Sequence, residues 1–60
     1  MTYVLTIYDV NEDEFFSETI HDVDGIGDLA DRIERVICYH EHIKNRTFTL
    51  ISATLVGGPN

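Results

Sequence analysis

Residues 26–40, IGDLADRIERVICYH, contain the apolar spacing of a helix, while the segments on either side of them lack it. Asp24 lies just before this stretch as a predicted N-cap, because its carboxylate can accept hydrogen bonds from the free amides of a first helical turn. Asn45 follows as a residue suited to a helix end. The spacing predicts one amphipathic helix, whose core-facing stripe comprises Ile26, Leu29, Ala30, Ile33, Val36, Ile37 and His40.

Three segments around this helix have the β-branched and aromatic composition of strands: residues 3–10, 15–23 and 47–56. Polar residues 11–14 separate the first two segments and predict a hairpin. The helix then returns the chain, so the third strand can lie beside the first and antiparallel to it. We expect a single α+β domain over residues 1–60, with ββαβ order, a three-stranded antiparallel sheet in the order 2-1-3, one helix on one face, and a frayed tail at residues 57–60.

The first and third strands carry apolar side chains on both of their faces, which is typical of strands that are buried on both sides. One helix covers only one face, so we expect a second copy of the chain to cover the other in a homodimer. The alternative is that threonine and serine hydroxyls keep this face wet, and that a bulge explains the mixed pattern of the third strand. The side chains predicted for the dimer face are Val4, Tyr8, Val10, Phe48 and Leu50.

A chain of 60 residues forms a small core, which disulfides, a structural metal or oligomerisation usually support. The single cysteine, Cys38, cannot form an intramolecular disulfide, and it suits a reducing compartment. The first residues lack the basic and apolar regions of a signal peptide, so we expect a cytoplasmic protein. Apolar runs are too short for a membrane span.

The net charge of −7 is unevenly distributed. Residues 1–31 hold nine of the 11 acidic residues and no lysine or arginine. Direct binding to nucleic acid is disfavoured, because such binding depends on lysine and arginine contacts to phosphates. The same repulsion disfavours anionic membranes.

The stretch CYHEH, residues 38–42, holds the cysteine and two of the three histidines. On a helix Cys38 and His42 are neighbours, whereas His40 lies within the apolar stripe. Zinc requires three or four protein ligands, and only His21 or carboxylates remain to complete such a set. We therefore predict no metal, no cofactor and no catalytic residue. The alternative is a small metal-binding module or enzyme centred on Cys38, His42 and His21.

The acidic residues predict a docking surface, although solubility alone also favours an acidic face. We expect a non-enzymatic interaction protein that binds a basic or nucleic-acid-binding protein and inhibits it by occupying a site. A structural subunit of a larger assembly is a further possibility. The residues predicted to contact the partner are Glu12, Asp13, Glu14, Glu18, Asp22, Asp28 and Asp31.

A short acidic chain without a catalytic constellation resembles, in type, the small phage-encoded proteins that bind and inhibit host enzymes or defence systems. Some of those proteins imitate the phosphates of DNA. This resemblance implies a viral protein, with DNA mimicry as one mode of action. Such mimicry requires two rows of carboxylates on one face, and Arg32 and Arg35 interrupt the acidic side chains of the helix.

Overall fold

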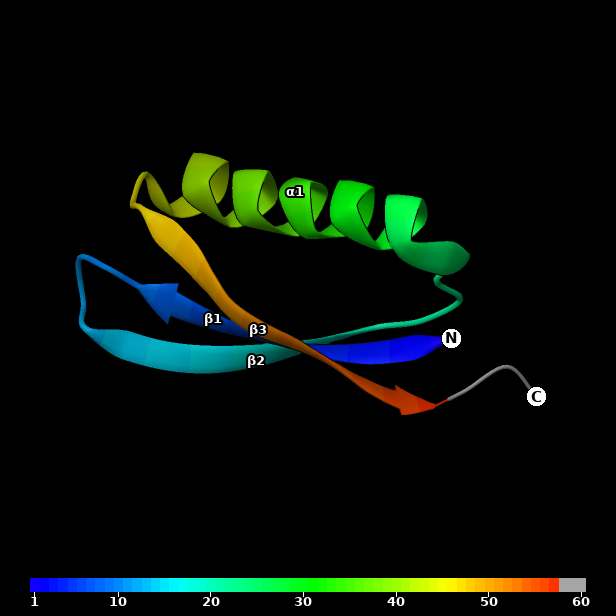
Figure 1. Cartoon of the computed structure of the whole chain (residues 1–60). Helices are drawn as coiled ribbons and strands as arrows, with labels where there is room; N and C mark the ends of the chain where they lie inside the picture. The colour runs from blue at the N-terminus through cyan, green and yellow to red at the C-terminus, as the bar shows by residue number, and fades with distance from the viewer. Residues whose placement is uncertain (58–60) are drawn as a thin grey trace.

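The structure is a computed structural model that describes residues 1–57. Strands β1 (Thr2–Asp9), β2 (Glu14–Ile20) and β3 (Phe48–Gly57) form one antiparallel sheet in the order β2-β1-β3, and helix α1 (Gly25–Lys44) crosses one face of it (Figure 1). The predicted ββαβ fold and strand order are confirmed. Of the predicted tail, Gly57 belongs to β3, and residues 58–60 lie outside the described part of the chain.

The ends of α1 follow from local backbone chemistry. Gly25 adopts a φ of 88°, which a residue without Cβ tolerates most easily. Asp24 precedes it but makes no side-chain cap, so the predicted role of its carboxylate is wrong. Instead, the Asp24 N–H donates to Oδ2 of Asp28 at 2.8 Å, which is the half of a capping box that reaches back from inside the helix. At the other end, Asn45 takes the left-handed conformation with a φ of 53°, as predicted for a helix stop.

The connection between β2 and α1 begins earlier than predicted. β2 ends at Ile20 rather than continuing to residue 23, and Asp22 turns the chain with a φ of 57°. Val23 is nevertheless buried, and its N–H donates to the carbonyl of Met1 at 2.8 Å. The N-terminal ammonium of Met1 donates to the Val23 carbonyl at 3.0 Å, so the start of β1 is joined to the loop that enters α1.

The core lies between α1 and the sheet and is centred on β1. Leu5 and Ile7 have no exposed surface. Two residues of the predicted helical stripe are exceptions, because Ile26 is 85 % exposed and Ala30 is also exposed. They project from the first turns of α1, where β3 runs away from the helix (Figure 1). The buried apolar residues are Leu5, Ile7, Ile20, Val23, Leu29 and Phe48, with Ile33, Val36 and Ile37 packed against them.

A bulge in β3 decides which side chains face α1. Ile7 pairs with Leu50, but Thr6 pairs with Ser52, so Ile51 has no partner on β1. Side chains of paired residues share a face, and Leu50 therefore lies on the side of Ile7, beneath the helix. Phe48 is buried on the same side. The assignment of Phe48 and Leu50 to a dimer face is therefore wrong.

The sheet face without a helix is largely lined by hydroxyl groups. Val4 lies between Thr19 and Thr54, and Thr6 lies between serines of β2 and β3. The expectation of two apolar faces is wrong, because the bulge moves the large side chains of β3 to the helix side. Apolar surface on this face gathers at one end, where Tyr8 pairs with Phe15.

Matched leucine substitutions test this core. Leu5→Ala should lower the free energy of unfolding by about 2–5 kcal/mol, because it leaves a cavity in the centre of the core. A chain of this length has only about 3–9 kcal/mol in total, so a large fraction of the variant should unfold. Leu55→Ala removes the same atoms from a side chain that is 50 % exposed and should cost less than about 1 kcal/mol. Urea titration followed by circular dichroism measures both, and equal losses would contradict the assigned core.

Candidate interaction surface at the hairpin end

The side chain of Asp9 is a buried carboxylate that holds the turn between β1 and β2. The residue is only 5 % exposed. Its Oδ1 accepts hydrogen bonds from the backbone N–H groups of Asn11 at 3.1 Å and Glu12 at 3.2 Å. Its Oδ2 lies 3.1 Å from Nε of Arg46, which makes no well-aligned hydrogen bond, so charge holds that contact. Asp9 therefore fixes the turn and joins it to the segment after α1.

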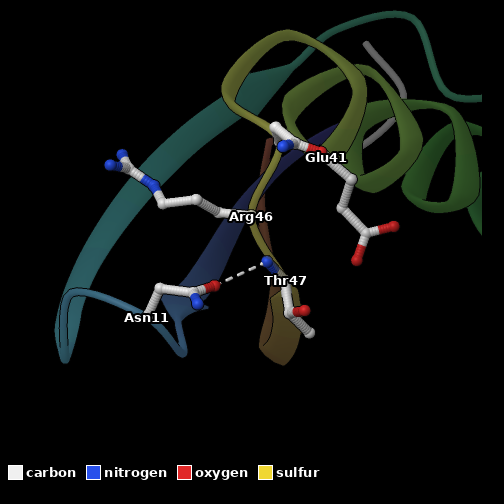
Figure 2. Close-up of a pocket in the computed structure, with 5 residues that line it drawn as sticks. Asn11, Glu41, Arg46 and Thr47 are labelled. Carbon is white, nitrogen blue, oxygen red and sulfur yellow. Dashed lines mark hydrogen bonds between the residues drawn. The ribbon is translucent and has the colours of Figure 1, made fainter.

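Further contacts close that segment onto the turn. Oδ1 of Asn11 accepts from the Thr47 N–H at 2.8 Å (Figure 2), and the Val10 N–H donates to the Thr47 carbonyl at 3.0 Å. Oε2 of Glu41 accepts from the Phe48 N–H at 3.2 Å, so α1 also holds the start of β3. Between these groups lies an open polar depression of about 360 Å³, lined by Asn11, Glu41, Asn45, Arg46 and Thr47. Because much of its lining is engaged in internal contacts, we assign it a structural role.

The tip of the turn combines carboxylates with exposed apolar side chains. Phe15 is 65 % exposed and Val10 is 46 % exposed. The Phe15 ring packs on Tyr8 with a centroid distance of 4.9 Å, and the Tyr8 hydroxyl donates to the carboxylate of Asp13. This hydrogen bond raises the pKa of Tyr8, since the neighbouring carboxylate favours the protonated phenol. We use the name hairpin tip for Val10, Glu12, Asp13, Glu14 and Phe15.

Glu18, which was predicted with the tip residues, serves a different contact. Its Oε1 lies 2.9 Å from Nε2 of His40. The His40 ring packs against Phe16 and Phe48, with centroid distances of 5.0 and 5.7 Å. His40 thus lies at the rim of the core, as its place in the apolar stripe predicted, and Glu18 holds it there.

The acidic residues at the start of α1 do not join the hairpin tip. The β1–β2 turn and the first turn of α1 lie at opposite ends of a molecule that is 38 Å long (Figure 1). Oδ1 of Asp28 lies 3.6 Å from Nε of Arg32, and Oδ2 of Asp31 lies 3.1 Å from a guanidinium nitrogen of Arg35. Each of these carboxylates therefore forms an ion pair with an arginine one turn further along α1. The seven predicted partner-binding residues therefore do not form one surface.

The predicted alternative metal set is also separated. Cys38 and His42 are exposed on α1, and His42 belongs to its last turn. His21 follows β2, which ends where α1 begins, and its Nδ1 lies 3.5 Å from the Thr2 hydroxyl. Among residues 1–57, no three histidine, cysteine or acidic side chains are grouped closely enough to hold a metal ion. In the same range, α1 is not sufficiently apolar along its length to cross a membrane.

The hairpin tip is the place where exposed apolar side chains and carboxylates without a strong internal cation coincide. Among the described residues, Asp13 and Glu14 form no ion pair, and Glu12 shares Arg46 with Asp9 at the longer distance of 3.6 Å. An exposed aromatic ring with a polar rim is the usual composition of a protein-binding surface. Comparisons with protein-family models, curated proteins and solved structures find no match to this chain.

Removing the cation beside Asp9 should destabilise the fold. Arg46→Gln leaves the buried Asp9 carboxylate without a charge partner, and we expect a loss of about 1–3 kcal/mol in the free energy of unfolding at neutral pH. Adding Asp9→Asn should recover part of that loss, because the amide oxygen can still accept from the two backbone N–H groups. Urea titrations of both single variants and the double variant measure the coupling. A double variant that loses the sum of the two single losses would show that the pair is not coupled.

The carboxylate of Asp28 makes acid stability testable at the helix start. The hydrogen bond from the Asp24 N–H, assisted by Arg32, holds the pKa of Asp28 below its usual value of 3.8. The resulting stabilisation is complete above pH 3.8 and is lost as the pH falls through the lowered pKa of the folded state. Asp28→Asn should therefore lose stability at neutral pH, and its difference from the wild type should shrink at more acidic pH.

Acid and urea titrations of the Asp28→Asn variant provide the measurement. Asp22→Asn makes the same charge change nearby and serves as the control. A difference between the wild type and Asp28→Asn that stays constant down to the acid transition would refute the assignment.

Proposed function

We propose that this protein is a non-enzymatic binding protein whose hairpin tip docks on a basic partner protein and blocks a site there. The observation that carries the proposal is Phe15, which is 65 % exposed and directly follows Glu12, Asp13 and Glu14 in the chain. Its ring and the Asp13 carboxylate both contact Tyr8. A large exposed aromatic ring is costly in water and is an effective anchor in a partner pocket. Its burial is worth about 1.5–3 kcal/mol on its own.

The tip is held in shape before it meets a partner. Asp9 fixes the backbone of the turn, Asn11 attaches it to Thr47, and Tyr8 binds both the Phe15 ring and the Asp13 carboxylate. A surface that is already ordered loses little conformational freedom on binding. This preorganisation supports a role for the tip as a rigid wedge, which suits inhibition by occupancy.

The charge of the tip favours a basic protein as the partner. Carboxylates around an apolar anchor accelerate association with a lysine- or arginine-rich surface and repel acidic proteins. Such basic surfaces are typical of nucleic-acid-binding proteins. The acidic groups at the hairpin tip and at the start of α1 lie at opposite ends of the molecule, too far apart to act as one continuous row of phosphate-like charges. We therefore place recognition in Phe15 with its local carboxylates rather than in imitation of a whole DNA segment.

Photo-cross-linking identifies the partner and tests the surface together. A photoreactive phenylalanine analogue at position 15 should capture one basic protein in cells of the source organism. The same analogue at position 34, an exposed site on α1, is the control and should not capture that protein. Capture from position 34 alone would overturn the placement of the binding surface.

Association kinetics with the captured protein then separate charge from packing. Neutralising Asp13 and Glu14 together, as Asp13→Asn and Glu14→Gln, should slow association about 3–10-fold at low salt and reduce its salt dependence. Phe15→Ala should mainly accelerate dissociation, by about 10–100-fold. The control, Asp24→Asn with Glu34→Gln, removes one carboxylate just before α1 and one on it, and should leave both rates near those of the wild type. Rates unaffected by all of the tip variants would refute the proposal.

A further inference from the structure

β3 is a long edge strand. Glu41 of α1 accepts from the N–H of its first residue, Phe48, and no strand among the described residues pairs with its outer side. β3 has 10 residues and pairs with β1 on one side only. An edge strand presents unpaired backbone N–H and C=O groups along its open side, which can form hydrogen bonds with another strand. Two residues that have no partner on β1, Ile51 and Val56, are also exposed, at 53 % and 57 %. β3 therefore offers both backbone groups and apolar side chains for strand addition.

The two edges of the sheet differ in charge. β2 carries Glu14 and Glu18, which would oppose like charges if two copies met along that edge. Residues 47–57 contain no lysine, arginine, aspartate or glutamate. Charged residues, proline, short length and bulges are the usual protections of an edge strand. β3 has the bulge at Ile51, but it contains no charged residue and no proline and is not short. In a chain with a net charge of −7, this is the strand along which two copies repel each other least.

An exposed flank of α1 continues this apolar edge. Glu41 marks the side of α1 that faces β3, because it accepts the hydrogen bond from the Phe48 N–H. An α-helix repeats about every 3.6 residues. Positions 4, 11 and 15 residues before Glu41 are close to one, three and four whole turns away, so residues 37, 30 and 26 lie on the same side of α1 as Glu41. Ile26 and Ala30 are exposed there, and Leu55 is 50 % exposed on β3. α1 and β3 diverge at this end (Figure 1), so apolar groups of both elements are accessible.

We propose that a second copy of the chain occupies this edge, with β3 pairing antiparallel to its symmetry mate about a two-fold axis. A strand that pairs with its own copy in this way presents the same neutral residues to itself, so the contact is self-complementary. The product is a continuous six-stranded antiparallel sheet with both helices on one face. The α1 flank that carries Ile26 and Ala30 then lies beside its equivalent in the partner.

The estimated area of the contact places it among small, reversible interfaces. A strand of 10 residues at about 3.3 Å per residue is about 33 Å long. Since the smaller dimensions of the molecule are 17 and 14 Å, the flank offers about 500 Å² per copy, or about 1,000 Å² in total. That area is at the lower limit for a specific interface. We therefore expect a reversible dimer with a dissociation constant in the micromolar range.

Sedimentation equilibrium across a wide concentration range tests the dimer. The mass should rise from 6.9 kDa to about twice that value and no further. Ile51→Lys with Leu55→Lys places like charges on the proposed contact and should raise the dissociation constant at least 10-fold. Thr19→Lys places a lysine on the other edge strand, where it is exposed, and should dimerise like the wild type. Circular dichroism establishes that each variant is folded.

Isotope-filtered NMR on a mixture of labelled and unlabelled wild-type chains keeps the test valid if the lysine variant fails to fold. Intermolecular contacts should then join β3 to β3. A mass of 6.9 kDa at all concentrations, a larger assembly, or intermolecular contacts confined to β2 or to the hydroxyl-lined sheet face would each overturn the proposal. The proposal would also be overturned if Thr19→Lys abolished dimerisation while the Ile51→Lys, Leu55→Lys variant dimerised like the wild type.

Discussion

The buried carboxylate of Asp9 is the interaction on which the arrangement of this small protein depends. It lies at the end of the central strand, accepts hydrogen bonds from the turn that follows, and meets a cation supplied from beyond the helix. A chain of this size has little apolar surface to bury, so a charged group in its interior must serve several contacts at once. Through Asp9 and Arg46, the hairpin and the α1–β3 connection hold one another in place.

The second constraint is the bulge in β3, and it explains why the sequence predicts the fold well but the faces of the sheet poorly. Strand composition and helical spacing are local properties, so the elements and their order followed from them. A bulge reverses the side-chain alternation of every residue beyond it. The sequence does not show that the bulge lies at Ile51. For this reason Phe48 and Leu50 could not be assigned to the helix side, and the free face could not be recognised as hydroxyl-lined.

The candidate surface could be predicted in part for a similar reason. Glu12, Asp13 and Glu14 were recognisable because a polar run between two strands lies in a turn. The roles of Asp9 and Arg46 could not be recognised, because their contact joins positions 37 residues apart and depends on the tertiary fold. Asp31 and Glu18 were misplaced because charge composition does not show which acid already has a partner, here Arg35 and His40. Phe15, the apolar half of the surface, could be placed on the free sheet face from alternation in β2, but its exposure requires the structure.

The proposed binding and dimer surfaces occupy different parts of the molecule, and this has a consequence for affinity. A two-fold axis through the β3 edge directs the two hairpin tips in opposite directions, so neither tip is covered when the dimer forms. The dimer then carries two equivalent sites that can engage two copies of a partner, or two sites on one oligomeric partner. Two sites on one oligomeric partner raise the overall affinity, because binding of the second tip is then intramolecular. Binding of two separate partner copies does not. A reversible dimer that carries two acidic hairpin tips is therefore best suited to a partner that presents repeated basic sites.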